Sequence, residues 1–515
     1  MLVRDSIFLT GITGAIGSWL AREALHRGFH VTALVRDKDL EAARRRIEAA
    51  LDIVGARTSG RDIEIALGDI ALKGLGMRAA GVPSHFRTIV HCAGCIEFHD
   101  QAAKLSRRTN VEGTRHVLEF ASRHRVPVVH VSTAYICGLR AGTVKEDEVD
   151  LGQGFHNVYE RTKCEAEKRV HQWSRETSLP AIVLRPSIVV GDSREGRTVR
   201  FNTLYDLMHA FERIAPSLGG EEIRVAGSAR ATKNLIPIDY FGGAAWRIIS
   251  RGVPGTYHIT NPAPVTVGEM RNVFARLFGV GRIRLVGADE FARRAATRAE
   301  RLYQRATEIY APYMTGEPRF DRANTDAALS GSGIEMPAMD LPFFERLLGY
   351  ARRADWGRRH EEPLPIADFG LPIEGSIRSH SAFGNRQSAI SVGPPPDVAR
   401  YFDEFLVSKL HQQLLPQLRR LTASFRVVMK ESPREHWSVA IVRGALESVT
   451  RNGMPTQCTF LVDYPTFTEI VGGRLSPKQA FFKRRIEISG DMEAGLKLAT
   501  VLAEFFRQFP FEAGG

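Results

Sequence analysis

The sequence predicts an α/β protein built on a Rossmann-type, doubly wound parallel sheet. Short β-branched runs alternate with amphipathic helical patterns from residue 7 to about residue 190, as expected for parallel strands joined by crossover helices. The first run leads directly into a glycine-rich turn at 10–17, and a tyrosine and a lysine lie four residues apart at 159–163. In this order and spacing, the three features predict a nicotinamide-dependent reductase.

Six strands are expected in this first region. They lie at 6–10, 30–35, 62–67, 87–91, 127–132 and 181–185. The following region, 195–355, mixes helices with short strands and contains a long charged helix near 287–310. We interpret it as a substrate-side subdomain of the same unit, so the reductase domain is expected to span residues 1–357.

The composition changes after this unit. Residues 358–396 are rich in Arg, Pro, Gly and Ser and lack a sustained apolar period, which predicts a linker. An amphipathic helix is expected over 397–418, followed by strands and then by three helical segments and one more strand. The strands are expected at about 423–431, 436–443, 446–451, 456–462 and 485–488. Residues 397–515 are therefore predicted to form a small α+β domain.

Length and composition restrict the class of protein. A chain of 515 residues is too long for one ordinary core, and 43% hydrophobic with 25% charged residues is typical of a soluble globular protein. No apolar stretch is long enough to span a bilayer, and no signal peptide is recognised, so at most peripheral membrane contact is expected. Five scattered cysteines indicate a reduced, cytoplasmic compartment, with Cys92 and Cys95 as packing residues. No metal site is predicted.

The net charge of +12 would suit an anionic partner, such as the phosphates of NADP, coenzyme A, an acidic carrier protein or a membrane surface. Much of this charge lies in Arg-rich helical stretches around 293–305, for which solvated helix faces are the simpler interpretation. No nucleic-acid module is visible, so we expect no nucleic-acid partner. The oligomeric state stays open.

The glycine turn predicts a dinucleotide site. Glycines between a strand and a helix permit a tight turn, a close approach to a pyrophosphate and close packing of helix on strand, and the helix N-terminus offers unpaired N–H groups to the phosphates. The residues of this turn expected to bind the cofactor are Gly11, Thr13, Gly14, Ala15, Ile16 and Gly17.

The end of the second strand predicts the choice of cofactor. An NAD site usually has a carboxylate there, whereas this strand ends in Arg36, whose guanidinium can hold a 2′-phosphate. Asp37 follows and could favour NAD, but we expect it to point to the opposite side. Arg46 is a possible second phosphate contact. We therefore predict NADP(H).

Two further strand ends are expected beside the cofactor. Asp69 and Ile70 end the third strand, where the aspartate can reach the adenine amino group. Ala93 and Gly94 follow the fourth strand, where small residues let the backbone pass beside the cofactor; a simple tight turn is the alternative.

Tyr159 and Lys163 share one helix face and are the predicted catalytic pair. A phenol with a pKa near 10 is a poor acid or base at neutral pH, and a nearby ammonium is expected to lower that pKa and to hold the nicotinamide ribose. Thr133 is expected to donate to the substrate carbonyl, with Ser132 as its competitor. Asn110 could orient the lysine through a water. The alternative for Tyr159 and Lys163 is an ordinary helix surface.

These residues resemble the extended short-chain dehydrogenase/reductase superfamily over about 5–355, and most closely its fatty acyl-CoA reductase and thioester reductase (male sterility-like) branch. The motifs that carry the resemblance are TGITGAIG (10–17), LVRD (34–37), HCAG (91–94), TNVEGT (109–114), VSTAYICG (131–138), YERTK (159–163), LRPSIVVG (184–191), KNLIPIDY (233–240), YHITNP (257–262) and YAPYMTGEPRFDRANT (310–325). The resemblance implies that Thr133, Tyr159 and Lys163 are catalytic and that Pro186 and Ser187 line the nicotinamide pocket.

The tail from about 397 to 508 resembles the sterol carrier protein type two domain. WSVA (437–440), FLVDY (460–464), GRLSPKQAF (473–481) and IEISGD (486–491) carry this resemblance. A helical stripe of apolar residues in the last segment is either ordinary core or the lining of a lipid tunnel, and the resemblance favours the tunnel. The stripe consists of Met492, Leu496, Ala499, Leu502, Phe505 and Phe506.

Three functions are consistent with this sequence. The first is NADPH-dependent reduction of a long-chain acyl thioester, on coenzyme A or an acyl carrier protein, to an aldehyde or alcohol, with a lipid in the C-terminal domain. The second is an NADP-dependent dehydrogenase or reductase of a sterol or other lipid alcohol or ketone. The third is a lipid-binding or transfer protein with a regulatory nucleotide fold.

Overall fold

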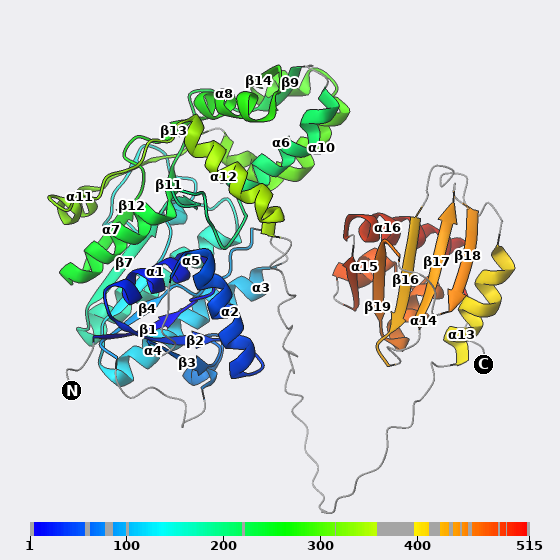
Figure 1. The fold of residues 1–515 in the computed structure, drawn as a ribbon, viewed down its shortest axis with the longest axis horizontal. Helices are drawn as coiled ribbons and strands as arrows, with labels where there is room; N and C mark the ends of the chain where they lie inside the picture. Colours follow the sequence, from blue (N-terminus) through cyan, green and yellow to red (C-terminus); the bar gives the residue numbers. More distant parts are fainter. Residues whose placement is uncertain are drawn as a thin grey trace, which may run out of the picture. The chain divides into compact units, whose positions relative to one another are not determined.

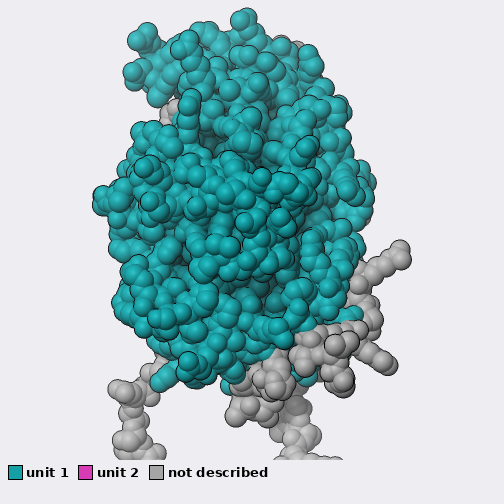
Figure 2. All heavy atoms as spheres, turned by 90° about the vertical axis from the view of Figure 1, so that its left-hand side faces the viewer, with its two compact units in different colours: residues 1–372 teal, residues 373–515 magenta. Residues whose placement is uncertain are grey.

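The computed structural model describes residues 5–511, except 57–61, 78–85, 99–101, 219–221, 315, 358–395, 411–422, 432–435, 443–444, 452–455, 483–484 and 491. The chain divides into two compact units, residues 1–372 and 373–515. Figure 2 shows one side of the first unit, whose described atoms pack into a continuous body. The predicted linker, 358–396, lies outside the described residues apart from Pro396.

The first unit is built on a seven-stranded sheet in the order β12-β7-β5-β4-β1-β2-β3, and all neighbouring strands are parallel (Figure 1). The strands are β1 (Ser6–Thr10), β2 (His30–Val35), β3 (Ile63–Leu67), β4 (Thr88–His91), β5 (Val128–Val131), β7 (Ala181–Pro186) and β12 (Gly255–Ile259). The predicted doubly wound sheet and its six strands are confirmed. β1 lies at the point where the strand order reverses, between β2 and β4, which is where such sheets bind ligands.

Helices cover both faces of the sheet because alternate strand residues point to opposite sides. Ile7 and Leu9 belong to the core beneath α1, α2 and α7, whereas Phe8 between them packs in the core beneath α4 and α5. The helices are α1 (Ala15–His26), α2 (Leu40–Ile53), α3 (Ala103–Ser106), α4 (Gly113–His124), α5 (Val158–Thr177) and α7 (Ile238–Arg251).

Part of the region predicted as a substrate-side subdomain belongs to the main sheet instead. β12 pairs with β7 in parallel and forms the edge of the sheet, and α7 packs against α1. The indole nitrogen of Trp246 in α7 donates to the carbonyl of Leu20 in α1 at 3.0 Å. α11 (Ala323–Leu329) packs on α7 and β12. The interpretation of 195–355 as one subdomain was wrong for these segments. β12 extends the seven-stranded sheet, and α7 belongs to the core on one face of that sheet.

The remaining segments of that region form a second layer with its own core. Its elements are α6 (Leu204–Leu218), β9 (Glu222–Ala226), α8 (Val267–Phe278), β14 (Arg282–Val286), α9 (Ala288–Ala292), α10 (Arg298–Thr307) and α12 (Leu341–Arg353). Three short strand pairs accompany it, namely β8 (Ile188–Val190) with β11 (Leu235–Pro237), β10 (Thr232–Lys233) with β13 (Val265–Thr266), and β6 (Thr143–Val144) with β15 (Arg319–Phe320).

The prediction of a single long helix near 287–310 was wrong. The segment contains two helices, α9 and α10, and a 3-10 turn over Glu308–Met314. Thr297 starts the second helix: its hydroxyl accepts from the N–H of Glu300, and the Glu300 carboxylate accepts from the N–H of Thr297. This reciprocal cap fixes a helix start inside the charged stretch.

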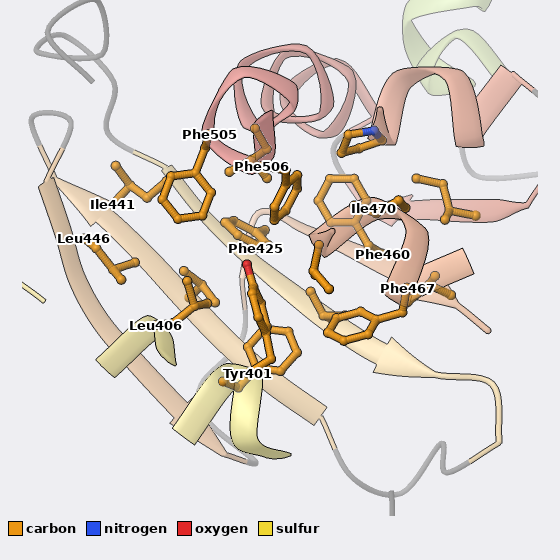
Figure 3. A pocket seen from close by; sticks show the side chains of 18 residues that line it. Tyr401, Leu406, Phe425, Ile441, Leu446, Phe460, Phe467, Ile470, Phe505 and Phe506 are labelled. Carbon is orange, nitrogen blue, oxygen red and sulfur yellow. The ribbon is translucent and has the colours of Figure 1, made fainter. Parts of the chain in front are cut away.

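The second unit is a five-stranded mixed sheet in the order β18-β17-β16-β19-β20, packed against helices around an apolar pocket (Figure 3). β16 and β19 are parallel and the other pairs are antiparallel. Its elements are α13 (Pro396–Ala399), β16 (Ala423–Met429), β17 (His436–Val442), β18 (Ala445–Arg451), β19 (Cys458–Val462), α14 (Tyr464–Val471), α15 (Pro477–Phe482), β20 (Ile486–Gly490) and α16 (Met492–Gln508). The predicted α+β fold is confirmed.

The helix predicted over 397–418 is helical as far as Lys409. It continues from α13 as a π-helical stretch, Arg400–Leu406, and a 3-10 turn, Val407–Lys409, and most of its remainder lies outside the described residues. Across the part of the chain that the structure describes, no helix is both long and apolar enough to cross a bilayer.

We expect Phe8→Ala to lower the free energy of unfolding of the first unit by about 3–5 kcal/mol. Phe8 is fully buried, and its ring lies 5.3 Å from that of Phe86 and 5.1 Å from that of Phe120, so the truncation leaves a cavity. Urea unfolding of the full chain measures the change. Leu40→Ala is the control, because Leu40 is 55% exposed. Equal effects of the two substitutions would contradict the assigned core.

Candidate active site

The glycine turn after β1 is shaped by close backbone contacts. Gly11 has a φ of +80°, and a Cβ atom there would lie 2.7 Å from the backbone nitrogen of Ala93, in the loop after β4. A Cβ atom on Gly17 would lie 2.0 Å from the carbonyl oxygen of Gly11. The turn therefore needs glycine at both positions, and it lies against the β4 loop and α1 at the carboxyl edge of the sheet.

The first turn of α1 fits a pyrophosphate. Gly14 is the residue at the helix start and supplies no side-chain cap, while its own N–H donates to the Gly11 carbonyl at 3.0 Å. The N–H groups of the first turn, at Ala15 and Ile16, are left for an anion, and the helix dipole favours negative charge there. A dinucleotide bound at this turn would supply the hydride or accept it.

Arg36 lies at the end of β2, as predicted, with a side chain that is half exposed. Its guanidinium is 3.7 Å from the carboxylate of Asp69, which follows β3. The Asp69 carboxylate also accepts from the N–H of Ala71 at 2.9 Å. The two side chains thus lie together across the β2 and β3 ends, where the adenosine part of a dinucleotide would bind.

Asp37 is buried and paired with Arg46. Its side chain is 1% exposed and lies 2.8 Å from the guanidinium of Arg46. Burial acts to raise the pKa of Asp37, but the hydrogen bonds from Arg46 and from the N–H of Lys38 lower it overall. Arg46 also donates to the carbonyl of Arg36 at 2.9 Å and approaches the Thr13 hydroxyl at 3.4 Å. Arg46 therefore connects the β2 end to the glycine turn.

Ile70, Ala93 and Gly94 have different surroundings. The Ile70 side chain is buried in the core and would collide with a Cβ atom at Gly113 in α4. The N–H of Ala93 donates to the Thr10 hydroxyl at 3.2 Å, which fixes the β4 loop to the end of β1. A Cβ atom on Gly94 would lie 3.3 Å from the amide oxygen of Asn110.

Asn110 lies in a π-helical turn over Arg107–Glu112, and its side chain holds the β4 loop. Its amide oxygen accepts from the N–H of Cys95 at 2.7 Å, and its amide nitrogen donates to the Cys95 carbonyl and the Thr162 hydroxyl, each at 3.0 Å. These contacts tie the loop to α5. The water-mediated link from Asn110 to the lysine stays a prediction.

The structure brings Tyr159, Lys163 and Thr133 together. Tyr159 lies in the first turn of α5, which begins after Asn157, whose side chain accepts from the N–H of Glu160 at 3.0 Å. The phenol is hydrogen-bonded to Thr133, at the end of β5. One turn further along, the Lys163 ammonium donates to the carbonyl of Val131 at 2.8 Å.

The predicted lowering of the phenol pKa was wrong for the protein in this state. Burial raises the pKa of Tyr159 to about 12, although the hydrogen bond with Thr133 acts to lower it. Burial also lowers the pKa of Lys163 to about 8. The phenol is therefore protonated at neutral pH, so it can donate a proton to a substrate but is a poor base.

Ser132 and Thr133 have separate contacts. The Ser132 hydroxyl donates to the Glu167 carboxylate at 2.5 Å, away from the phenol. The Thr133 hydroxyl lies 3.5 Å from the carbonyl of Pro186, at the end of β7. The next residue, Ser187, is buried, and its hydroxyl has no hydrogen-bond partner among the described residues. An unpartnered hydroxyl just after β7 fits a polar ligand group such as a carboxamide.

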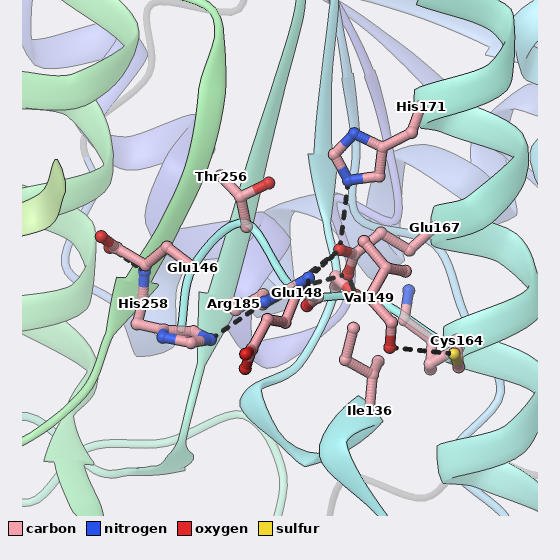
Figure 4. Close-up of polar contacts among 12 residues, drawn as sticks. Ile136, Glu146, Glu148, Val149, Cys164, Glu167, His171, Arg185, Thr256 and His258 are labelled. Atoms are coloured by element: carbon pink, nitrogen blue, oxygen red, sulfur yellow. Dashed lines mark hydrogen bonds and ion pairs between the residues drawn. The ribbon is translucent and has the colours of Figure 1, made fainter. Parts of the chain in front are cut away.

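A buried ion pair that the sequence interpretation missed anchors α5 to the sheet (Figure 4). Arg185 in β7 and Glu167 in α5 are both fully buried, and the guanidinium reaches the carboxylate at 2.5 Å. Although burial acts to raise it, the Arg185 charge holds the pKa of Glu167 at about 2. His171 approaches the same carboxylate at 3.3 Å, and His258 of β12 approaches Arg185 at 3.1 Å.

Polar contacts that were also missed join the start of α5 to the second layer. The Tyr313 hydroxyl donates to the Glu160 carboxylate at 2.5 Å and accepts from the Asn157 amide at 2.7 Å. Glu317 accepts from the Lys233 ammonium and the Tyr135 hydroxyl, each at 3.0 Å. Their segment is the YAPYMTGEP stretch, so its aromatic and acidic residues were the available signal.

Phe98 lies between the rings of Tyr159 and Tyr310. The ring of Phe98 lies 5.9 Å from that of Tyr159 and 5.9 Å from that of Tyr310, both in edge-to-face geometry. Phe98 follows the β4 loop, whereas Tyr310 comes from the second layer. These two segments are far apart in the sequence, and no local pattern predicts that they meet at the site.

The parallel sheet, the glycine cradle and the phenol–ammonium pair define a nicotinamide-dependent oxidoreductase of the short-chain dehydrogenase/reductase type. Residues 9–243 match the male sterility protein family, and residues 402–503 match the SCP-2 sterol transfer family. The chain therefore carries a male sterility-type NAD-binding domain followed by a sterol carrier domain, and the predicted resemblance is confirmed.

Two curated fungal proteins are similar to this chain. The non-canonical nonribosomal peptide synthetase FrzA of a Cladobotryum species is 26% identical, over 67% of this chain and 36% of the relative. The aldehyde reductase lnaA of Aspergillus flavus is 25% identical, over 70% of this chain and 37% of the relative. The chain thus spans little more than a third of the length of either protein.

Two solved structures share the fold. The terminal R domain of the myxalamid PKS-NRPS pathway has a TM-score of 0.58 at 26% identity, covering 68% of this chain and 92% of the other. The reductase domain of a nonribosomal peptide synthetase from Mycobacterium tuberculosis has a TM-score of 0.54 at 19% identity, covering 68% and 92%.

We expect Gly11→Ala to weaken dinucleotide binding by about tenfold or more, because the added Cβ strains a positive-φ residue and pushes on Ala93. Titration of intrinsic fluorescence with NADPH measures the dissociation constant. Gly287→Ala is the matched control, since nothing lies within 4 Å of a Cβ there and its φ is −64°. If Gly11→Ala left the dissociation constant for NADPH unchanged, the result would argue against pyrophosphate binding at this turn.

Proposed function

We propose that the protein reduces an acyl thioester, held on coenzyme A or a carrier protein, to an aldehyde or alcohol with NADPH. The observation that carries this proposal is the meeting of Tyr159, Thr133 and Lys163 beside the glycine turn, on a fold shared with R domains. Long-chain acyl groups are the proposed substrates because a lipid-carrier-type domain follows on the same chain. We propose the division into 1–357, 358–396 and 397–515 for these functions.

In this mechanism, the glycine turn at Gly11–Gly17 would hold a reduced nicotinamide dinucleotide, which would supply a hydride for the thioester carbonyl carbon. Thr133 and Tyr159 donate hydrogen bonds to the carbonyl oxygen, where negative charge develops, and Tyr159 supplies the proton. The carbon–sulfur bond of the resulting hemithioacetal then breaks while its hydroxyl proton is transferred to the sulfur, so that the products are an aldehyde and a free thiol. Lys163, held by the Val131 carbonyl, is proposed to contact the nicotinamide ribose, and Asn110 to position the loop after β4.

The similarity to known proteins favours thioester reduction over the alternative of a lipid alcohol dehydrogenase. Residues 9–243 match the male sterility protein family, and the fold is shared with the terminal R domain of the myxalamid pathway. Tyr159, whose pKa burial raises to about 12, holds its proton at neutral pH and is suited to act as the proton donor.

NADPH is the proposed cofactor because two arginines lie at the end of β2, while the carboxylate of Asp37 is already paired. Arg36 is half exposed, and Arg46 lies between the β2 end and the glycine turn. Asp37, the acidic residue that could accept from a ribose hydroxyl, is buried under Arg46. A 2′-phosphate would find charge-assisted donors there.

Tyr159→Phe is expected to lower kcat by about a hundredfold or more, because it removes the positioned proton donor while leaving the ring in place. The measurement is NADPH consumption with palmitoyl-CoA, with product analysis by mass spectrometry. Tyr257→Phe is the control. Tyr257 lies on the edge strand β12, and its hydroxyl donates to the carbonyl of Val253. Retention of full turnover by Tyr159→Phe, or no turnover of any acyl thioester by the native chain, would contradict the proposal.

Arg36→Ala is expected to raise the dissociation constant for NADPH by about tenfold or more, since a charged hydrogen bond is lost, and to leave that for NADH within about twofold. Fluorescence titration with each cofactor gives both constants. Arg87→Ala provides a control, because that arginine is 70% exposed and pairs with Asp5 at the other end of the strands. An equal loss for both cofactors would argue against recognition of the 2′-phosphate.

A further inference from the structure

Two buried histidines lie side by side near the centre of the seven-stranded sheet. His91 ends β4 and His130 lies in β5; the two are partners in the strand register, and their rings are 5.3 Å apart. Ile89 and Val128, two residues before them on the same strands, belong to the apolar core beneath α4 and α5, so the histidines face this side as well. A polar ring buried in such a core needs hydrogen-bond partners.

His91 has partners for both ring nitrogens. Its Nδ1 lies 2.8 Å from the hydroxyl of Thr10, at the end of β1, and its Nε2 lies 3.1 Å from the hydroxyl of Thr114 in α4. Burial lowers the pKa of His91 to about 3, so the ring is neutral. These contacts give His91 a structural role, because they tie two strands to one helix.

His130 has a different environment. Its Nε2 lies 3.4 Å from the Lys163 ammonium, whereas its buried Nδ1 has no hydrogen-bond partner among the described residues. Burial, and to a lesser degree the charge of Lys163, keeps the pKa of His130 well below its usual value, so this ring is neutral too. An ammonium can only donate, so the nitrogen that faces it is the unprotonated one, and the ring proton is on Nδ1.

The Lys163 ammonium therefore has two acceptors from consecutive residues of β5. The carbonyl of Val131 accepts at 2.8 Å, and Nε2 of His130 approaches from the preceding residue. An ammonium carries three N–H groups, and no third acceptor is found in the described part of the chain. One N–H group is thus left for a ligand.

We propose that His130 is a positioning residue for Lys163. Its imidazole accepts a hydrogen bond from the ammonium and, together with the Val131 carbonyl, directs the remaining N–H group toward the nicotinamide ribose. The ribose contact rests on the proposed function, whereas the contact between the two side chains does not. Packing alone does not account for His130, because an aliphatic side chain would fill this face without leaving a buried ring nitrogen unpartnered.

The ionisation of Lys163 provides the readout. Burial lowers its pKa to about 8, and the carboxylate of Glu167, one turn further along α5, opposes this effect. Burial raises the pKa values of Cys92 and Tyr159 to about 12, so these neighbours stay neutral, as do the two histidines. Loss of the His130 acceptor would destabilise the ammonium relative to the free amine, so it would lower the pKa of Lys163 further.

The test measures NADPH binding to the full chain against pH, so it does not depend on turnover. Intrinsic fluorescence is titrated with NADPH from about pH 7 to about pH 10, above the second pKa of a phosphate ester, which is about 6. In the native chain, the dissociation constant should rise as the pH passes about 8, where Lys163 loses its charge. His130→Leu should lower this midpoint by about one pH unit and weaken binding at about pH 7.5 by about three- to tenfold.

Two further variants separate the acceptor from the bulk of the side chain. In His130→Gln the amide oxygen can take the place of Nε2, so the midpoint should return toward its native value. His130→Asn has a shorter amide, which stays near the position of Nδ1, so it should shift the midpoint as His130→Leu does. His130→Asn also keeps the test open if His130→Leu fails to fold, and circular dichroism melting of every variant checks folding.

His124→Leu is the matched control. This histidine lies at the C-terminal end of α4, with its ring 4.4 Å from that of Phe120, and its loss should leave the midpoint unchanged. A native midpoint in folded His130→Leu or His130→Asn, or a midpoint in His130→Gln as low as in those variants, would overturn the proposal. The expected shifts without thioester turnover by the native chain would count only against the proposed function.

Discussion

The buried ion pair between Arg185 and Glu167 is the interaction on which the active site depends. Both side chains are removed from water, and the carboxylate is the point where β7, α5 and the end of β5 meet. Loss of one partner would leave an uncompensated buried charge, which typically costs about 3–5 kcal/mol. Glu167 lies one turn after Lys163 and two turns after Tyr159, so the ion pair fixes the helix that carries both proposed catalytic side chains.

The site around this anchor is assembled from strand ends and is closed by residues from the second layer. The sheet supplies the glycine turn, the Arg36 and Asp69 side chains and the Thr133 hydroxyl, whereas the second layer supplies Tyr310 and Tyr313. The strand ends set where a dinucleotide would fit. Phe98, which follows β4, contacts the ring of Tyr159 on one side and that of Tyr310 on the other, so the second layer reaches the site through this residue.

The same division explains how much the sequence could predict. The six core strands and the glycine turn follow from local periodicity and spacing, and their positions were predicted closely. β12 was missed because it follows a long excursion into the second layer before it pairs with β7. The start of α10 was missed although Thr297 and Glu300 carry a recognisable cap. The contacts of Phe98, Tyr313 and Arg185 join distant segments, so burial at the site could not be inferred from any single motif.

β12 follows its partner strand β7 by about 70 residues in the sequence, and this separation has a practical consequence for work on fragments. The similarity to the male sterility family ends at residue 243, whereas the edge strand spans Gly255–Ile259. A fragment that stops where the similarity stops would lack this strand and would expose the backbone of β7 along its whole length. An open edge beside fully buried side chains invites pairing with other chains, so such a fragment would tend to aggregate during expression. On the ribosome, the growing chain meets the same hazard until residue 259 has left the exit tunnel.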